Sequence, residues 1–301
     1  MKKAVLIINP SSGGEQAKQY EEMAKTKLTE FFGEVRVEYT KQAGDATRFA
    51  AQACRDRVHS VFVMGGDGTV SEGLSGIAEK EYRPRFGFFP LGTVNDLARA
   101  LGISLDPSSS IAEFDIEAHK AIDIGRINQK YFMNVVAMGT VPEAINSVES
   151  KDKTKWGAFA YFASAFKQLM NMQYHKFCLE IDGKMQNVES STILIGLTNS
   201  IGGFEQILPN AEVDDGILHL IYLKDSNVMD SVMAVPNLIG GIDESTNNIG
   251  YRTFRHAKIS IQDPNAEPLT VNVDGDEGDT LPIEIGILPS HIDVYFGPNK
   301  A

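Results

Sequence analysis

A glycine-rich run with one carboxylate and one hydroxyl, Gly65 to Thr69 (GGDGT), directly follows the apolar stretch Val61 to Met64. The apolar stretch is typical of a buried strand, and glycines after a strand let backbone N–H groups approach a ligand closely. Such a run suits a bound phosphate, with Asp67 facing a divalent metal or a reacting proton. A strand-to-helix turn without a ligand gives the same pattern, so the assignment depends on the rest of the chain.

A second polar loop, Pro90 to Arg99 (PLGTVNDLAR), also follows a predicted strand and leads into a predicted helix. The N–H groups of a helix start can bind an anion. Thr93 and Asn95 offer side-chain hydrogen bonds, and Asp96 adds a second carboxylate. These residue types are also ordinary helix caps, but next to the glycine-rich run they favour a ligand site.

A third loop, Asn9 to Gly14 (NPSSGG), ends in two glycines and can wrap the phosphates of a nucleotide. It lacks the Lys-Ser or Lys-Thr of a P-loop, and it is not a GxGxxG fingerprint. A kinase without a P-loop lysine must neutralise phosphate charge with metal, backbone N–H groups and helix ends.

Two acidic turns lie in the second half of the chain. Asp274 to Asp279 (DGDEGD) is typical of a solvated turn or an open calcium-like loop, and it lacks the EF-hand spacing. Pro209 to Leu218 (PNAEVDDGIL) places oxygen ligands closely around a turn. That pattern suits a hard cation and a plain Asp-Gly hairpin turn about equally.

Strand and helix patterns alternate through the first part of the chain and would position these loops. Strands are predicted at 4–8, 35–39, 61–64 and 86–89, and helices at 15–32, 45–57, from about 70, and at 93–101. Such alternation predicts a parallel sheet that binds ligands at the carboxyl ends of its strands. The three polar loops all lie at those ends.

After about Ile124 the pattern becomes β-rich, with short strands separated by Gly, Asp, Asn and Pro. The predicted fold is α/β, with a parallel-sheet nucleotide-binding domain at 1–124 and a mostly antiparallel β-sandwich at 125–291. Helices are predicted at 156–173 and 228–239. The C-terminal residues 292–301 are expected to return to the first domain.

Composition limits the classes of partner. The chain has 301 residues, 43% of them hydrophobic, and no apolar run approaches the ~20 residues that span a bilayer. A net charge of −12 argues against nucleic acid as a partner. Two distant cysteines, Cys54 and Cys178, give neither a disulfide framework nor a metal-ligand spacing, which favours a reducing cytosol.

The three polar loops together, with PLGTVNDLARAL at 90–101, resemble the soluble bacterial diacylglycerol kinase family of lipid kinases. Sphingosine and ceramide kinases share its catalytic domain. AIDIG at 121–125, NVVAMG at 134–139 and VDGD at 273–276 follow in the expected order, so the resemblance covers essentially the whole chain. NAD kinases also contain GGDGT, but their other glycine-rich segments are not apparent here.

The resemblance implies an enzyme that transfers the γ-phosphate of ATP to the hydroxyl of diacylglycerol or a related lipid, with Mg²⁺ as cofactor. It implies that Asp67, Asp96 and Asp123 organise the catalytic magnesium. The residues implied to surround ATP are Asn9, Pro10, Ser11, Ser12, Gly13, Thr40, Gly65, Gly66, Asp67, Gly68, Thr69, Val70, Ser71, Glu72, Thr93 and Asn95. A structural magnesium is implied at Glu212, Asp215 and Ile217.

The general base is the point where this chain departs from the family pattern. That pattern is Asp-Gly-Glu, whose Glu removes the proton of the lipid hydroxyl. Here Asp276 stands at the Glu position, with a side chain one methylene shorter, and Glu277 follows it. Asp276 is assigned as the base, Glu277 is the alternative, and a weakened enzyme is one interpretation.

The implied partner is a membrane lipid. Lys151 to Lys176 combines five lysines with aromatic residues, which suits a peripheral membrane contact as well as a helix packed on its own domain. The expected location is the cytoplasm, with transient association with the inner face of the membrane, and a homodimer is compatible with the sequence. Two alternatives stay open: a kinase for another substrate, such as a sphingoid base or NAD, and a non-catalytic nucleotide-binding regulator.

Overall fold

The computed structural model describes residues 2–14, 17–139, 173–201, 203–205, 207–224, 242, 244–246, 248–263 and 265–298. The chain divides into two compact units: unit 1 is Met1–Ile124 with Leu288–Ala301, and unit 2 is Gly125–Ile287. The helix predicted at 228–239, and that predicted at 156–173 apart from its last residue, lie outside the described residues, as does most of Lys151 to Lys176.

Unit 1 contains a parallel sheet, which confirms the predicted fold class. Its strands are β1 (Lys3–Ile8), β2 (Glu34–Tyr39), β3 (Ser60–Gly65), β4 (Arg85–Pro90) and the end of β18 (Ile283–Tyr295), in the order β2-β1-β3-β4-β18. The last strand joins through Val294, which pairs in parallel with Phe86. The C-terminal segment therefore returns to the first sheet.

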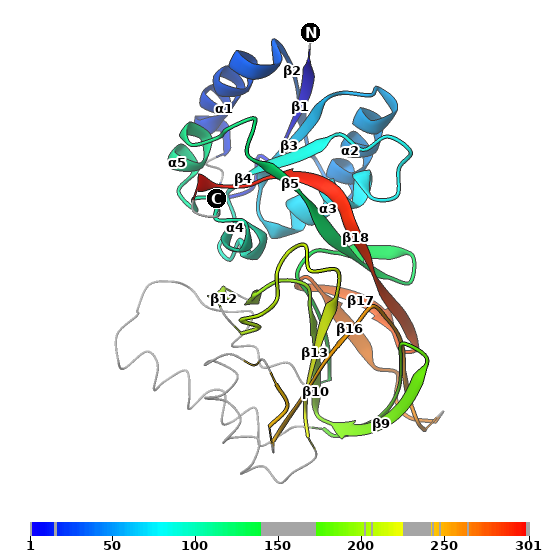
Figure 1. Ribbon diagram of the computed structural model, residues 1–301. Coiled ribbons are helices and arrows are strands. Elements are labelled where there is room, and N and C mark those ends of the chain that lie inside the picture. The colour runs from blue at the N-terminus through cyan, green and yellow to red at the C-terminus, as the bar shows by residue number, and fades with distance from the viewer. Residues whose placement is uncertain are drawn as a thin grey trace. The chain divides into compact units, whose positions relative to one another are not determined.

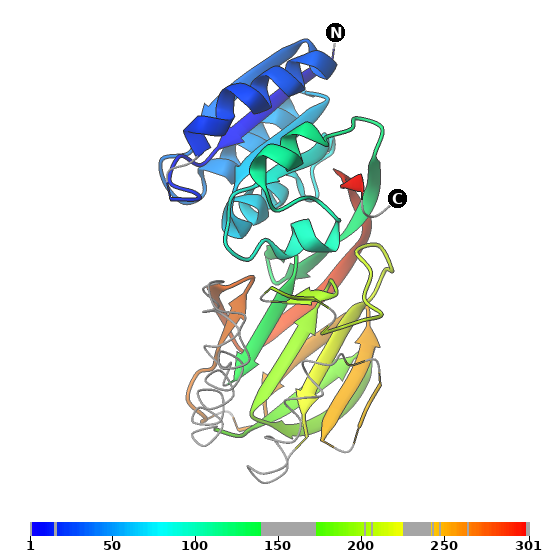
Figure 2. The same cartoon turned by 90° about the vertical axis from the view of Figure 1, so that its left-hand side faces the viewer.

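Helices cover both faces of this sheet. They are α1 (Ala17–Phe32), α2 (Asp45–Arg55), α3 (Asp67–Ile77), α4 (Asp96–Ala100) and α5 (Pro107–Ala112). α1 and α5 pack on one face and α2 and α3 on the other (Figure 1), and Figure 2 shows α1 and α5 in front of the sheet. Leu6 and Phe62 from the sheet pack with Leu28 and Phe32 of α1, because alternate strand residues face opposite sides.

Two helices begin elsewhere than predicted. α3 begins at Asp67, not near Val70, because Gly66 already has the extended conformation of an N-cap and its carbonyl accepts the Val70 N–H at 3.0 Å. α4 begins at Asp96, not Thr93, because Asn95 has φ +55° and cannot belong to the helix. Asp67 and Asp96 are therefore each the first residue of a helix.

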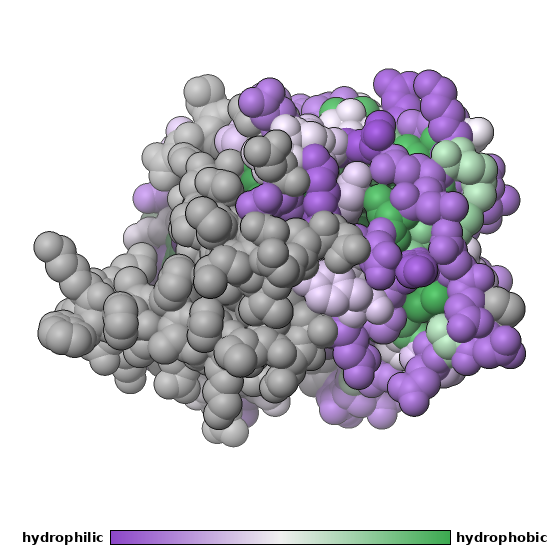
Figure 3. All heavy atoms as spheres, turned by 90° about the horizontal axis from the view of Figure 1, so that it is seen from below, coloured by the Kyte–Doolittle hydropathy of each residue, from purple (hydrophilic) through white to green (hydrophobic). Residues whose placement is uncertain are grey.

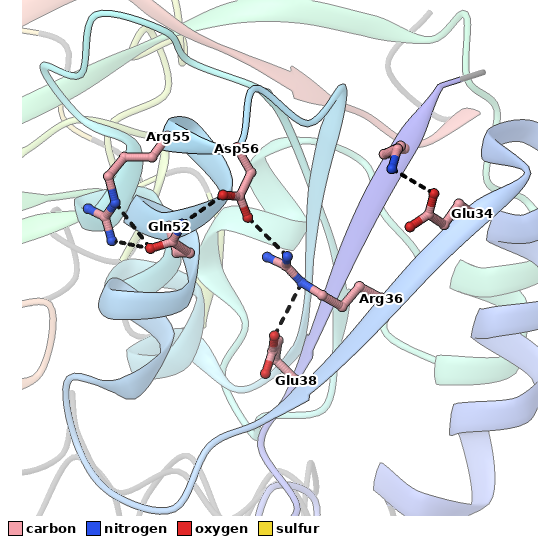
Figure 4. A network of polar contacts seen from close by, with 7 residues as sticks. Glu34, Arg36, Glu38, Gln52, Arg55 and Asp56 are labelled. Carbon is pink, nitrogen blue, oxygen red and sulfur yellow. Dashed lines mark hydrogen bonds and ion pairs between the residues drawn. The ribbon is translucent and has the colours of Figure 1, made fainter.

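The edge strand β2 carries charged residues that link it to its neighbours (Figure 4). Arg36 contacts Glu38 at 3.2 Å and Asp56 at 2.9 Å, and Lys3 pairs with Glu34 at 2.9 Å. Charge on an exposed edge disfavours pairing with another chain. Exposed ion pairs add little stability, about 0–1 kcal/mol each.

Unit 2 is a β-sandwich with antiparallel pairing. In addition to β5 (His119–Ile127), which spans the unit boundary, its strands are β6 (Lys130–Phe132), β7 (Val135–Gly139), β8 (His175–Ile181), β9 (Lys184–Ser190), β10 (Thr192–Gly196), β11 (Ser200–Ile201), β12 (Phe204–Glu205), β13 (Leu218–Leu223), β14 (Ile249–Phe254), β15 (His256–Ile261), β16 (Thr270–Val273) and β17 (Asp276–Thr280). One layer is β18-β15-β8-β9 with β5 and β6, and the other is β14-β13-β10-β7-β16-β17.

The apolar core of unit 2 lies between these layers. Phe177 and Ile259 from one layer pack with Ile195 and Leu220 from the other. Ile221, next in β13, belongs to a second cluster on the outer side of its sheet. The face seen in Figure 3 is mostly hydrophilic over the described residues, with apolar areas separated by polar ones.

Candidate active site

The carboxylate of Asp67 joins the two loops that follow β3 and β4. Its Oδ2 accepts the N–H of Asn95 at 2.8 Å, and its Oδ1 accepts the N–H of Asp96 at 3.0 Å. These are donors at the start of α4, and a carboxylate at a helix start is also favoured by the helix dipole. GGDGT and PLGTVND, separate in the sequence, thus form one structure at the carboxyl ends of β3 and β4.

The pKa of Asp67 is raised above its ordinary value of 3.8, mainly by burial and also by the nearby Asp96 carboxylate, while the two N–H bonds act in the opposite direction. A raised pKa means that the folded protein holds the proton more tightly than the unfolded chain does. Stability therefore falls as pH rises through this pKa, and the ionised form is costly at neutral pH. A cation beside Asp67 and Asp96 would offset this cost, so the donor set fits Mg²⁺.

Asn95 shapes the loop between β4 and α4. Its Oδ1 accepts the N–H of Gly92 at 3.0 Å and its Nδ2 donates to the Gly92 carbonyl at 2.8 Å. These bonds hold Asn95 in the left-handed conformation that asparagine tolerates better than most residues. The amide of Asn95, expected to touch ATP, is thus occupied within its own loop.

The glycines of GGDGT serve different purposes. A Cβ on Gly65 would lie 2.7 Å from the Thr69 Cβ, and one on Gly66 would lie 3.2 Å from the Gly92 Cα. Packing within the protein therefore leaves no room for a Cβ at Gly65 and little room for one at Gly66. A Cβ on Gly68 would meet no atom of the described chain within 4 Å, and the residue is exposed. Packing does not explain Gly68, whereas a ligand that approaches the first turn of α3 does.

The loop after β1 is tied to the same place. Asn9 Nδ2 donates to Thr69 Oγ1 at 2.9 Å, and Asn9 Oδ1 accepts the N–H of Ser11 at 3.1 Å. Gly13 and Gly14 have φ +62° and +66°, conformations that glycine adopts without strain. Three loops that are distant in sequence thus converge at one edge of the sheet.

A cavity of about 450 Å³ opens between two of these loops. Its lining residues are Ser12, Gly13, Gly14, Pro90, Leu91, Gly92, Thr93, Leu105 and Pro107. This volume lies within the range of small-molecule sites, about 300–1,000 Å³. The backbone and small polar groups of the two loops, together with the apolar Leu91, Leu105 and Pro107, suit a nucleotide.

Four other residues that were predicted to surround ATP also lie in unit 1. Val70 is buried, and its side chain belongs to the interior of unit 1. Thr40 donates its N–H to the Ile8 carbonyl at 2.9 Å, next to the loop after β1. Pro10 is half-buried in the turn after β1, and Ser71 is half-buried in α3.

Glu72 caps a helix. Its carboxylate accepts the N–H groups of Gly44 at 2.9 Å and Ala46 at 3.2 Å, at the start of α2, and its carbonyl accepts the Thr47 hydroxyl at 3.0 Å. Sequence analysis missed this role because the cap comes from a residue 26–28 positions away, and cap patterns are read locally. The side chain fixes α3 to α2, behind the Asp67 turn.

The structure does not bring the three predicted magnesium carboxylates together as one set. Asp123 is buried, and its Oδ1 accepts the N–H of Ser290 at 2.7 Å, which holds β18 against β5. Among the described residues, no group of three Asp, Glu, His or Cys side chains is arranged to hold a metal ion. Asp67 and Asp96 lie close together, so magnesium bound there needs water and phosphate oxygens as further ligands.

The predicted structural metal site in unit 2 is a tight turn around Asp215. Oδ1 accepts the N–H of Ile217 at 3.0 Å, while Oδ2 accepts the N–H of Glu212 at 3.1 Å and contacts His219 Nε2 at 3.0 Å. Burial alone would raise the pKa of Asp215, but these hydrogen bonds hold it below 3.8. The Asp215 carboxylate and the backbone carbonyls of its own turn are hard oxygen donors, the type of ligand that Mg²⁺ prefers.

His219 of β13 contacts this turn and Tyr251 of β14, and neither residue was identified from the sequence. His219 is 2% exposed, and its Nδ1 lies 2.7 Å from the Tyr251 hydroxyl. Its two ring nitrogens therefore join Asp215 to Tyr251 across neighbouring strands. A single histidine in an apolar strand gives no sequence signal for such a role.

The acidic turn Asp274 to Asp279 forms a hairpin in unit 2. Asp276 is the first residue of β17 and pairs with Val273, and Glu277 pairs with Asn272. Successive strand residues face opposite sides of a sheet. Asp276 and Glu277 are both exposed but point to opposite faces, so they cannot both serve the same site.

Comparison with known proteins identifies the class. Residues 3–127 match the family model of the diacylglycerol kinase catalytic domain, and residues 134–296 match that of the YegS C-terminal NAD kinase beta sandwich-like domain. The chain belongs to the diacylglycerol kinase family and is a lipid kinase-type enzyme. Membership implies the use of ATP.

Individual relatives support this assignment over the full chain. The chain is 34% identical to a diacylglycerol kinase of Bacillus subtilis (strain 168), with 100% of this chain and 98% of the relative covered. It is 36% identical to a diacylglycerol kinase of Staphylococcus aureus (strain bovine RF122 / ET3-1), with 99% and 93% covered. A crystal structure of a candidate diacylglycerol kinase from Bacillus anthracis strain Sterne matches with a TM-score of 0.83 at 26% identity, covering 100% and 99%.

Gly68→Ala tests the ligand role of the exposed glycine. We expect ATP affinity to fall about tenfold, equivalent to ~1.4 kcal/mol, because the new methyl group occupies space beside α3 that no protein atom fills. The melting temperature should stay the same or rise slightly, since alanine favours a helix over glycine by up to about 1 kcal/mol. Calorimetric titration with ATP and thermal unfolding measure the two effects.

Gly76→Ala in the same helix is the matched contrast. Its Cβ would overlap the Thr47 carbonyl and lie 2.8 Å from the Ala50 Cβ, so stability should fall by about 1–3 kcal/mol. If Gly68→Ala bound ATP like the parent protein, Gly68 would not face the nucleotide.

Glu72→Ala tests the cap on α2. We expect a loss of about 0.5–2 kcal/mol in the free energy of unfolding, because two N–H groups at the start of α2 lose their acceptor. Glu30→Ala, an exposed change in α1, is the control and should cost much less. Urea unfolding of both variants decides, and equal midpoints would show that Glu72 is not a cap.

Proposed function

We propose that this protein transfers the γ-phosphate of ATP to the hydroxyl of diacylglycerol in a Mg²⁺-dependent reaction. The observation that carries the proposal is the Asp67 turn: a half-buried carboxylate of raised pKa beside an exposed glycine, bonded to the loop after β4 that lines a cavity of nucleotide size. Family membership supports the reaction class, and the named relatives support diacylglycerol as substrate.

The proposed roles in unit 1 follow from its hydrogen bonds. Phosphates lie against the first turn of α3 and the loop after β1, where backbone N–H groups and the helix start provide positive charge. Asp67 and Asp96 would hold Mg²⁺, with water among its other ligands, and a bound ion would supply positive charge beside the transferred phosphate. Asp123 contributes from a distance through water and by fixing β18.

The proposed general base is Asp276. Its place at the end of a short, tied hairpin gives the carboxylate a defined position without burying it. The Asp215 turn would hold a second, structural Mg²⁺ within unit 2, with carbonyl oxygens of Glu212 and Ile217. The first proposal rests on the family resemblance and the hairpin that places Asp276, and the second on the resemblance and the oxygen donors of the Asp215 turn.

Diacylglycerol is a bilayer lipid, so the proposed enzyme acts at a membrane surface. Among the helices in the described part of the chain, none is long and apolar enough to cross a membrane. Because the proposed substrate is a membrane lipid, we propose transient peripheral contact from the cytoplasm. A homodimer is compatible with this arrangement.

Replacing Asp67 tests the magnesium and ATP part of the proposal. We expect Asp67→Asn to lower kcat at least about a hundredfold, because the proposed Mg²⁺ ligand loses its negative charge and one acceptor oxygen. The assay is ³²P transfer from ATP to dioleoylglycerol in phosphatidylglycerol vesicles, with sphingosine and NAD as competing substrates. Asp56→Asn, in the network of Figure 4, is the control. Full activity of Asp67→Asn would refute the proposed site.

The roles of Asp276 and Glu277 can be separated by mutation. Asp276→Asn should lower kcat at least about a hundredfold, the scale of general base catalysis, while Glu277→Gln on the other face should stay within about twofold. Asp276→Glu restores the residue of the family pattern and should raise kcat. The reverse result for the first two variants would assign the base to Glu277.

A further inference from the structure

The side chain of Asp274 ties the hairpin before Asp276 to the start of β7. Its Oδ2 accepts the N–H of Met133 at 2.7 Å, and its Oδ1 accepts those of Asn134 at 2.9 Å and Val135 at 3.0 Å. The Asp274 N–H in turn donates to the Val135 carbonyl at 2.9 Å. Four hydrogen bonds thus hold Asp274 against Met133 to Val135, where the NVVAMG segment begins.

The turn itself needs this support. Asp274 and Gly275 have φ +51° and +99°, so both turn residues are left-handed, as in the two-residue turns that suit hairpins. Left-handed backbone is unfavourable for a residue with a Cβ. Asn272 Oδ1 accepts the Gly275 N–H at 3.0 Å and closes the turn. Asp276 follows at once, paired with Val273.

We propose that Asp274 is a positioning residue for the reaction: it fixes the turn so that the Asp276 carboxylate has one direction. Asp274 is not the base itself, because its two oxygens are bonded to three backbone donors. This inference rests on the proposed function, in which Asp276 removes the lipid proton. The proton goes from the lipid hydroxyl to the Asp276 carboxylate while the hydroxyl oxygen bonds to phosphorus and the bond to ADP breaks.

The same unit contains a matched turn remote in sequence. Asp182 and Gly183, between β8 and β9, have φ +46° and +77°, and Ile181 pairs with Lys184. Asp182 Oδ1 accepts the N–H groups of Arg255 at 3.2 Å and His256 at 3.0 Å. Its N–H donates to the His256 carbonyl at 2.9 Å. The two turns are therefore built in the same way, but no residue with an assigned catalytic role follows Gly183.

The experiment compares Asp274→Asn and Asp274→Ala with Asp182→Asn and Asp182→Ala in the full chain. ATP affinity, melting temperature and kcat for dioleoylglycerol in phosphatidylglycerol vesicles are measured well below the melting temperature. We expect kcat to fall about tenfold in Asp274→Asn, which keeps one acceptor oxygen, and about a hundredfold in Asp274→Ala. KM for ATP should stay within twofold. The Asp182 variants should lose similar stability and keep kcat.

A double variant separates this inference from the proposed function. In the Asp276→Asn background, Asp274→Asn should cause no further loss of kcat, because it acts only through Asp276. Additive losses would overturn the inference, as would a kcat within twofold of the parent in Asp274→Asn or equal losses in the Asp182 variants. If Asp274→Ala does not fold, Asp274→Asn decides. Full activity of Asp276→Asn would instead refute the proposed base.

Discussion

The candidate site depends on one carboxylate in the loop after β3, which accepts the backbone N–H groups at the start of α4, the helix that follows β4. Asp67 accepts the N–H groups of Asn95 and Asp96, and so holds the loop after β4 against the loop after β3. The backbones can meet because Gly66 and Gly92 have no Cβ between them. This arrangement costs free energy because the Asp67 charge is half-buried and lies beside Asp96. Burial and the Asp96 carboxylate both raise the pKa of Asp67. That cost is lowered when a cation binds, so occupancy of the site and stability of unit 1 should be linked.

Unit 2 also contains carboxylates that accept several backbone N–H groups. Asp274, Asp182 and Asp215 each direct their carboxylate at backbone N–H groups close in space, and Asp274 and Asp182 thereby hold a two-residue turn. A carboxylate with several N–H partners is well solvated by protein, so such turns keep their shape without an apolar core. Part of the acidic content of unit 2 is therefore structural.

The sequence was sufficient to predict the parallel sheet, the β-rich second half and the meeting of three loops at one sheet edge. Apolar strand runs and glycine-rich turns are local signals, and the topology rule for parallel sheets brings their ends together. Contacts made across the fold were not predictable in this way. Glu72 caps a helix far along the chain, His219 joins two strands, and Asp123 binds Ser290. The first turn of α3 was misplaced because glycine and Asp67 looked like loop residues, although both suit a helix start.

These contacts change how an inactive variant is interpreted. An acidic residue of this protein can serve the chemistry, the backbone or both, and loss of activity alone does not distinguish them. The number of backbone N–H donors on each carboxylate helps to distinguish these roles. Asp274 has three and shapes a turn, Asp67 has two together with a neighbouring carboxylate, and Asp276 stands exposed on a strand. Carboxylates with several N–H partners should therefore affect stability whether or not they also serve the reaction, and a carboxylate left exposed at a tied position should affect catalysis alone.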